Sequence, residues 1–242
     1  MTIYETLGLP VKARIDRVVA KNQFYDRGEL SSADRKLFDA VEKIRWLYAL
    51  KTETVWIPPF RDGEKDYSEV EVLEVRLREE KQLNRLAEVI LRAIPYPMLL
   101  VFRLADKVRL YLGKLRQNKA DSERMTLAAT ECTEWLDEAD GFWQGIALNK
   151  MPCQNFCTLY EAWFDAVSKS RLAAWSLTAE NLTGEEAREK LARLNAIAQE
   201  MNRLRKQMKQ ERQFNRKMEL NARLQALKQE QKNIKEQGST SR

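Results

Sequence analysis

The sequence predicts an α+β protein with an antiparallel or mixed sheet flanked by helices, followed by a long C-terminal helix or helical hairpin of coiled-coil type. Runs of β-branched and aromatic residues alternate with segments of helical period, and two helix–strand–strand units can be drawn between residues 32 and 115. In addition, Glu185–Gln237 holds neither glycine nor proline. We therefore expect a globular body at 1–180, a basic helical arm at 181–237 and a disordered tail at 238–242.

The first elements of the body are predicted to be helical. Tyr4–Pro10 combines apolar residues with a Gly-Leu-Pro turn, which is typical of a short helix that ends there. A longer helix is expected to begin after Ser31 or Ser32, either of which can cap it. Its broad apolar stripe at helical spacing predicts the first core helix and consists of Leu37, Phe38, Val41, Ile44, Trp46, Leu47 and Leu50.

Two strands are predicted next. Thr52–Ile57 is rich in β-branched and aromatic residues and is stopped by two prolines. Val70–Leu77 alternates apolar and charged residues, which indicates a strand exposed on one face. We expect these two strands to pair as a hairpin around the charged loop Arg61–Tyr67.

Periodicity and turn signals predict the rest of the body. Apolar residues at helical spacing predict two helices, and runs of β-branched or aromatic residues predict three strands. The predicted elements are a helix at Lys81–Ile94, a hairpin of Met98–Leu104 with Val108–Leu115, a strand at Met125–Trp135 and a helix at Phe156–Ala173. A capping box at Thr183 and Glu186 marks the start of the arm.

The arm carries a thin apolar seam whose register shifts. Its first half repeats at intervals of three and four residues from Leu194 to Met208, which is the spacing of a coiled coil, and a shifted register follows from Leu220. The residues around this break either dock a partner or bend the helix into a hairpin that packs on itself or on the body. The predicted partner-binding residues are Leu204, Met208, Phe214, Asn215, Met218, Leu220 and Asn221.

The charge of the chain is concentrated in the arm. Glu185–Gln237 holds 14 Lys and Arg against 8 Asp and Glu, and this excess of six equals that of the whole chain. Nonspecific binding of nucleic acid is therefore an alternative function, although glutamates are interspersed and Phe214 is the arm's only aromatic residue. The phosphate contacts would come from Arg203, Arg205, Lys206, Lys209, Arg212, Arg216 and Lys217.

Composition excludes several classes of enzyme. The chain has no histidine, which removes Ser-His and Cys-His nucleophile pairs and the commonest metal ligand. Its three cysteines, Cys132, Cys153 and Cys157, form no CxxC pair, and eight scattered glycines make no phosphate-binding loop. We therefore predict no cofactor and no metal site. Sparse cysteine usage, and no apolar run long enough to span a membrane, favour a cytoplasmic protein.

A metal-dependent nuclease is the second alternative. Such a site needs two or three carboxylates around a divalent cation, and the strand at Val70–Leu77 offers Glu69, Glu71 and Glu74. Glu69 and Glu71 lie two residues apart and should share a face, whereas Glu74 should fall on the other. No Glu-x-Lys is present on this strand, and Glu74-Val75-Arg76 is the nearest relative of that motif. An ordinary strand face is therefore favoured.

Several segments together resemble an uncharacterised bacterial domain-of-unknown-function family. They are Lys21–Phe24, Ile44–Tyr48, Glu69–Leu77, Ile94–Pro97 and Glu211–Asn221. The resemblance implies an accessory component of phage-defence or restriction-like systems, encoded beside superfamily-2 helicases and DNA methyltransferases. It supplies no catalytic signature.

These observations favour a non-catalytic adaptor. We expect a compact body whose helical arm docks onto a helicase or DNA methyltransferase of the same system, with DNA as a further candidate partner. Homo-oligomerisation through the arm is left open, because a broken heptad run specifies neither partner nor stoichiometry.

Overall fold

The computed structural model describes residues 2–27, 30–117, 125–175, 177, 179 and 181–236. The chain divides into two compact units, Met1–Val167 and Ser168–Arg242, and each is considered by itself. The sequence places the boundary near residue 180, whereas the contacts group the end of the preceding helix with the arm. The predicted disordered tail at 238–242 lies outside the described residues.

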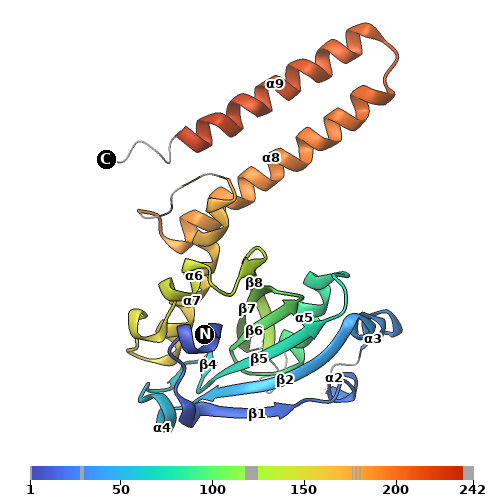
Figure 1. Cartoon of the computed structure of the whole chain (residues 1–242). Coiled ribbons are helices and arrows are strands. Elements are labelled where there is room, and N and C mark those ends of the chain that lie inside the picture. The colour runs from blue at the N-terminus through green and yellow to red at the C-terminus, as the bar shows by residue number, and fades with distance from the viewer. Residues whose placement is uncertain are drawn as a thin grey trace. The chain divides into compact units, whose positions relative to one another are not determined.

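A mixed sheet forms the centre of the first unit (Figure 1). Neighbouring strands run antiparallel except β5 and β6, which are parallel and are connected through helix α5. In their order across the sheet the strands are β1 (Arg14–Val18), β2 (Val41–Leu50), β5 (Val70–Leu77), β6 (Met98–Leu104), β7 (Lys107–Gln117) and β8 (Met125–Cys132). Strand β9 (Leu136–Asp137) also pairs with β7, and β3 (Phe60–Arg61) pairs with β4 (Asp66–Tyr67) in a separate ribbon.

Helices cover both faces of this sheet, so the unit has three layers. Alternate residues of the central strands enter different cores: Val70 and Val72 of β5 point to one, and Leu73 and Val75 to the other. The first core is closed by α1 (Ile3–Thr6), α6 (Gly141–Gly145) and α7 (Phe156–Ala173). The second is closed by α2 (Asn22–Arg27), α3 (Ser32–Leu37) and α5 (Leu83–Ala93).

The predicted first core helix is wrong, because its second half is strand β2. Helix α3 is capped by Ser31 but ends at Leu37, and after the 3₁₀ turn Phe38–Ala40 the chain becomes extended. The register of β2 against β5 shifts twice, between Val41 and Lys43 and again between Trp46 and Tyr48. Each irregularity breaks the two-residue alternation and produces apolar spacings of three, which imitate a helix.

The predicted pairing of the next two segments is also wrong. Thr52–Val55 is the short helix α4, which ends at Trp56 with a positive φ of 59°. Strand β5 is present as predicted, but it lies between β2 and β6, and every residue in it except Arg76 is buried. Its charged residues made it resemble an exposed strand, although Glu71 and Glu74 are inside the protein.

The other predicted elements of the body are confirmed. The sequence located helices α1, α5 and α7, the β6–β7 hairpin and strand β8 to within a few residues. Two more 3₁₀ turns, Val11–Ala13 and Leu148–Lys150, complete the description. Gly113 allows close packing in β7, since a Cβ there would lie 2.6 Å from Leu127 Cδ1.

The second unit contains a helical hairpin. Helix α8 (Gly184–Gln210) begins at the predicted capping box of Thr183 and Glu186, and α9 (Phe214–Glu236) returns beside it. Their facing sides bury an apolar seam that includes Leu191, Leu194, Ile197, Met201, Leu204, Leu224 and Ile234. The arm is therefore a hairpin rather than one continuous helix. No helix of the described part is long and apolar enough to cross a membrane.

Candidate functional site

The hairpin turn exposes an unusual pair of apolar side chains. Helix α8 ends at Gln210, and α9 starts at Phe214 after three intervening residues. Phe214 is 74% exposed and Met218 is 54% exposed. Because they stand four residues apart on one helix, the two side chains lie on the same face. We call Phe214, Met218 and the exposed residues between them the hairpin tip.

The structure separates the predicted partner-binding residues into two groups. Leu204 is buried in the seam, where it packs between the two helices of the hairpin. Met208, Leu220 and Asn221 are half-buried. Phe214, Asn215 and Met218 are exposed at the tip. The register break therefore coincides with the turn of the hairpin, and it leaves Phe214, Asn215 and Met218 exposed there.

The predicted nucleic-acid-binding residues are all exposed. Two of them form ion pairs with neighbouring glutamates: Arg203 lies 3.5 Å from Glu200, and Arg216 lies 3.7 Å from Glu211. Among the described residues no ion pair engages the other five, which are Arg205, Lys206, Lys209, Arg212 and Lys217. The tip and the helix turns beside it thus present a basic surface around the apolar pair.

The three candidate nuclease carboxylates do not converge. Glu69 and Glu71 line a cavity on the α5 side of the sheet, whereas Glu74 lines a different one on the opposite face, as the strand alternation predicts. Within the described residues no group of three or more acidic or cysteine side chains could hold a metal ion. The nuclease hypothesis therefore gains no metal centre from these residues.

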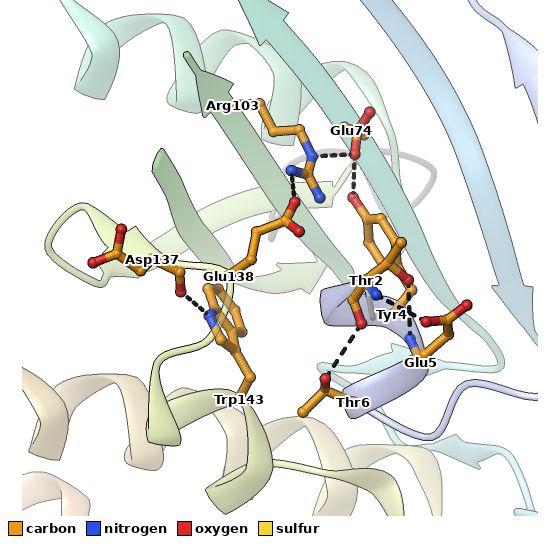
Figure 2. A network of polar contacts seen from close by, with 9 residues as sticks. All are labelled: Thr2, Tyr4, Glu5, Thr6, Glu74, Arg103, Asp137, Glu138 and Trp143. Atoms are coloured by element: carbon orange, nitrogen blue, oxygen red, sulfur yellow. Dashed lines mark hydrogen bonds and ion pairs between the residues drawn. The ribbon is translucent and has the colours of Figure 1, made fainter. Parts of the chain in front are cut away.

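Glu74 belongs instead to a largely buried ionic network that links four segments of the body, namely α1, β5, β6 and the loop after β9 (Figure 2). Its Oε2 atom accepts hydrogen bonds from the Tyr4 hydroxyl at 2.7 Å and from Arg103 Nε at 2.6 Å. The same guanidinium reaches Glu138 through Nη1. Figure 2 shows Arg103 placed between the two carboxylates, which come from β5 and from the loop after β9.

The pKa values in this network show that Tyr4 and Arg103 both keep their protons. Burial and the neighbouring Glu74 carboxylate raise the pKa of Tyr4 well above its ordinary value, so its hydroxyl remains a donor. Burial alone would lower the pKa of Arg103, but hydrogen bonds to Glu138 and Glu74 outweigh that effect and raise it. A permanent internal cation therefore supplies the positive charge beside Glu74. The sequence analysis did not predict the pairing of Arg103 with Glu74. The signal for it was Arg103 itself, a single charged residue within the apolar run Met98–Leu104.

Within the part of the chain that the structure describes, Glu71 has no comparable cation. It is 3% exposed and accepts a hydrogen bond from Trp46 Nε1, whereas the nearby Lys51 pairs with Glu69 at 2.9 Å. Burial raises the pKa of Glu71 to about 7, and the Trp46 hydrogen bond offsets part of that effect. This carboxyl group is thus poised to change charge near neutral pH.

A family model for a domain of unknown function, DUF4391, matches residues 7–230. The chain belongs to the DUF4391 family. Because the match covers the sheet, α8 and most of α9, the hairpin is part of the domain that defines DUF4391 rather than an addition to it. No curated protein and no solved structure was found to match this DUF4391 chain.

Proposed function

We propose that this DUF4391 protein is a non-catalytic accessory subunit that docks through its hairpin tip onto a partner enzyme. The observation that carries the proposal is the exposure of Phe214 and Met218 on one face of α9. Large apolar side chains that stay exposed in a basic, otherwise polar helix are typical anchors of protein interfaces. The three- and four-residue spacing of the seam supports a coiled-coil type of packing beneath them.

The charge around the tip indicates the chemistry of the partner surface. Lys209, Arg212 and Lys217 are exposed next to the apolar pair and have no ion pair within the described residues. Opposite charge at the rim of an interface speeds association and selects the partner. We therefore infer an acidic partner surface with an apolar depression that receives Phe214.

The resemblance noted from the sequence suggests which enzyme carries that surface. It implies phage-defence or restriction-like systems that contain a superfamily-2 helicase and a DNA methyltransferase. Membership of the DUF4391 family establishes the uncharacterised family itself, and the defence context is part of our proposal. In this proposal the helicase or methyltransferase performs the chemistry, and the DUF4391 chain positions it or couples it to another subunit.

Truncating the apolar pair should weaken docking strongly. We expect the double variant Phe214→Ala/Met218→Ala to bind the purified helicase or methyltransferase of its system at least about 30-fold more weakly, because interface anchors of this kind contribute about 2 kcal/mol or more. Titration calorimetry with the full chain measures this change. Both side chains lie outside the seam, so the helical content of the variant should stay unchanged.

Val11→Ala provides a matched control, because Val11 is an exposed apolar side chain of the body, at 85% exposure. It should bind as tightly as the unmodified chain. Binding of the double variant within about threefold of the unmodified chain, less than the roughly 30-fold loss expected from the anchors, would contradict docking through the tip. Failure of the unmodified chain to bind either enzyme would contradict the adaptor function itself.

Direct binding of nucleic acid remains the second candidate, and the exposure of all seven predicted basic residues favours it. If they contact phosphates, changing Arg212, Arg216 and Lys217 to Gln should reduce the slope of log K against log salt by about 2.7 on duplex DNA, at about 0.9 per contact. Fluorescence anisotropy between 50 and 200 mM salt, about the range over which such contacts respond, measures the slope. An unchanged slope and affinity would reject this function.

A further inference from the structure

The α5 side of the sheet contains a cavity that the docking function does not use. It encloses about 300 Å³ and lies where the end of α5 approaches α2 and strands β2 and β5. Its lining is mainly apolar and includes Phe24, Trp46, Leu73, Ile94 and Tyr96. A volume of this size is at the lower end of those that hold small molecules in proteins. The cavity therefore fits a compact ligand.

The walls come from segments far apart in the sequence. Gln23 and Phe24 belong to α2, Ala93 ends α5, and Ile94–Tyr96 lie in the turn between α5 and β6. The α2 pair and the turn residues lie in short segments to which the sequence analysis gave no separate function, Lys21–Phe24 and Ile94–Pro97. The two segments thus line the same cavity. We infer that forming this cavity is what they have in common.

Glu71 supplies the charge of the cavity. Its carboxyl group is almost fully buried, and Trp46 Nε1 donates one hydrogen bond to Oε2. The charged groups that act on it are Glu69, immediately before β5, and Lys51, immediately after β2. Since Lys51 is paired with Glu69, Glu71 forms no ion pair within the described residues. A buried carboxylate in apolar surroundings is costly unless a cation joins it.

We propose that this cavity binds a small, flat organic cation of the amidinium or guanidinium type. Such a group offers two adjacent N–H donors, which match the two oxygens of a carboxylate. A planar, apolar body would lie among the side chains of Phe24, Trp46 and Tyr96, and aromatic rings also attract a cation. A metal ion fits less well, because hard cations require several oxygen ligands and Glu69 is held by Lys51.

Benzamidine is the probe that tests this site. It stays protonated between pH 6 and 8, whereas Glu71 ionises within that range. We expect benzamidine to bind the full chain about tenfold more tightly at pH 8 than at pH 6, because the ionised fraction of a group with a pKa near 7 rises by that factor. Benzamide has the same size and no charge, so its weaker binding should not change with pH.

Variants assign the binding to the cavity. Glu71→Gln should remove the preference for benzamidine over benzamide, and Glu64→Gln, at an exposed loop residue, should leave it intact. Ala93→Leu fills the cavity without altering Glu71 and should weaken both probes, with melting curves confirming that each variant folds. The proposal is overturned if benzamidine does not bind at pH 8, or if Glu71→Gln binds it as tightly as the unmodified chain.

Discussion

Replacing Arg103 by Met should destabilise the body by about 3 to 5 kcal/mol, the range typical of breaking a buried ion pair from one side. The Arg103 side chain is 15% exposed and the Glu74 side chain 8% exposed. Among the described residues, removal of the guanidinium would leave the Tyr4 hydroxyl as the one donor to the Glu74 carboxylate. The loss should appear as a lower denaturant midpoint for the transition followed by fluorescence of the buried Trp143 and Trp163.

Two comparisons distinguish this cause from lost packing. Adding Glu74→Gln to Arg103→Met should restore much of the stability, because the stranded charge disappears with its partner. Lys107→Met removes an exposed ion pair, in which the side chains of Lys107 and Asp137 are 44% and 63% exposed. This variant should lose less than about 1 kcal/mol of unfolding free energy. If the double variant is no more stable than Arg103→Met alone, the network does not hold Glu74 as described.

The sequence predicted local structure well where one signal dominated. Helices α5 and α7 have continuous helical periods, and the β6–β7 hairpin has a short polar turn between apolar runs. The two errors in the body also have local causes. Bulges gave β2 the spacing of a helix, and Thr52–Val55 forms one helical turn despite its high β propensity.

The order of the strands in the sheet could not be predicted from local sequence patterns. The sequence grouped the strands into sequential hairpins, but β5 pairs with β2 on one side and runs parallel to β6 on the other. That placement puts both faces of β5 inside the protein and turns Glu71 and Glu74 into buried groups with different surroundings. Their charges could be read from the sequence; their burial could not.

The position of the hairpin turn was predictable, but the exposure of the individual apolar side chains around it was less so. The register shift and the isolated Phe214 indicated the hairpin turn, and the structure exposes that side chain. Leu204 has the same apolar character but packs inside the seam. Which residues of an amphipathic helix meet a partner depends on which ones its own neighbour covers, and that is a tertiary property.

Glu71 should make the stability of the body depend on pH. Its pKa is about 7 in the folded protein and close to 4.5 when the chain is unfolded, so the folded state holds the extra proton between these values. Stability therefore falls as pH rises from about 4.5 to 7, by about 3 kcal/mol at roughly 1.36 kcal/mol per pH unit. Glu71→Gln should be more stable than the unmodified chain by that amount at pH 8 and equal to it near pH 4.5.

Glutamine suits this test because its carbonyl oxygen can still accept the Trp46 hydrogen bond, so only the ionisation is removed. Glu64→Gln, at an exposed position, should show the pH dependence of the unmodified chain. Parallel curves of unfolding free energy against pH for Glu71→Gln and the unmodified chain would contradict the raised pKa. If the two curves instead meet near pH 4.5 and separate at pH 8, the ionised Glu71 carboxylate destabilises the folded protein at neutral pH. Such a cost is expected of a group that serves binding rather than stability.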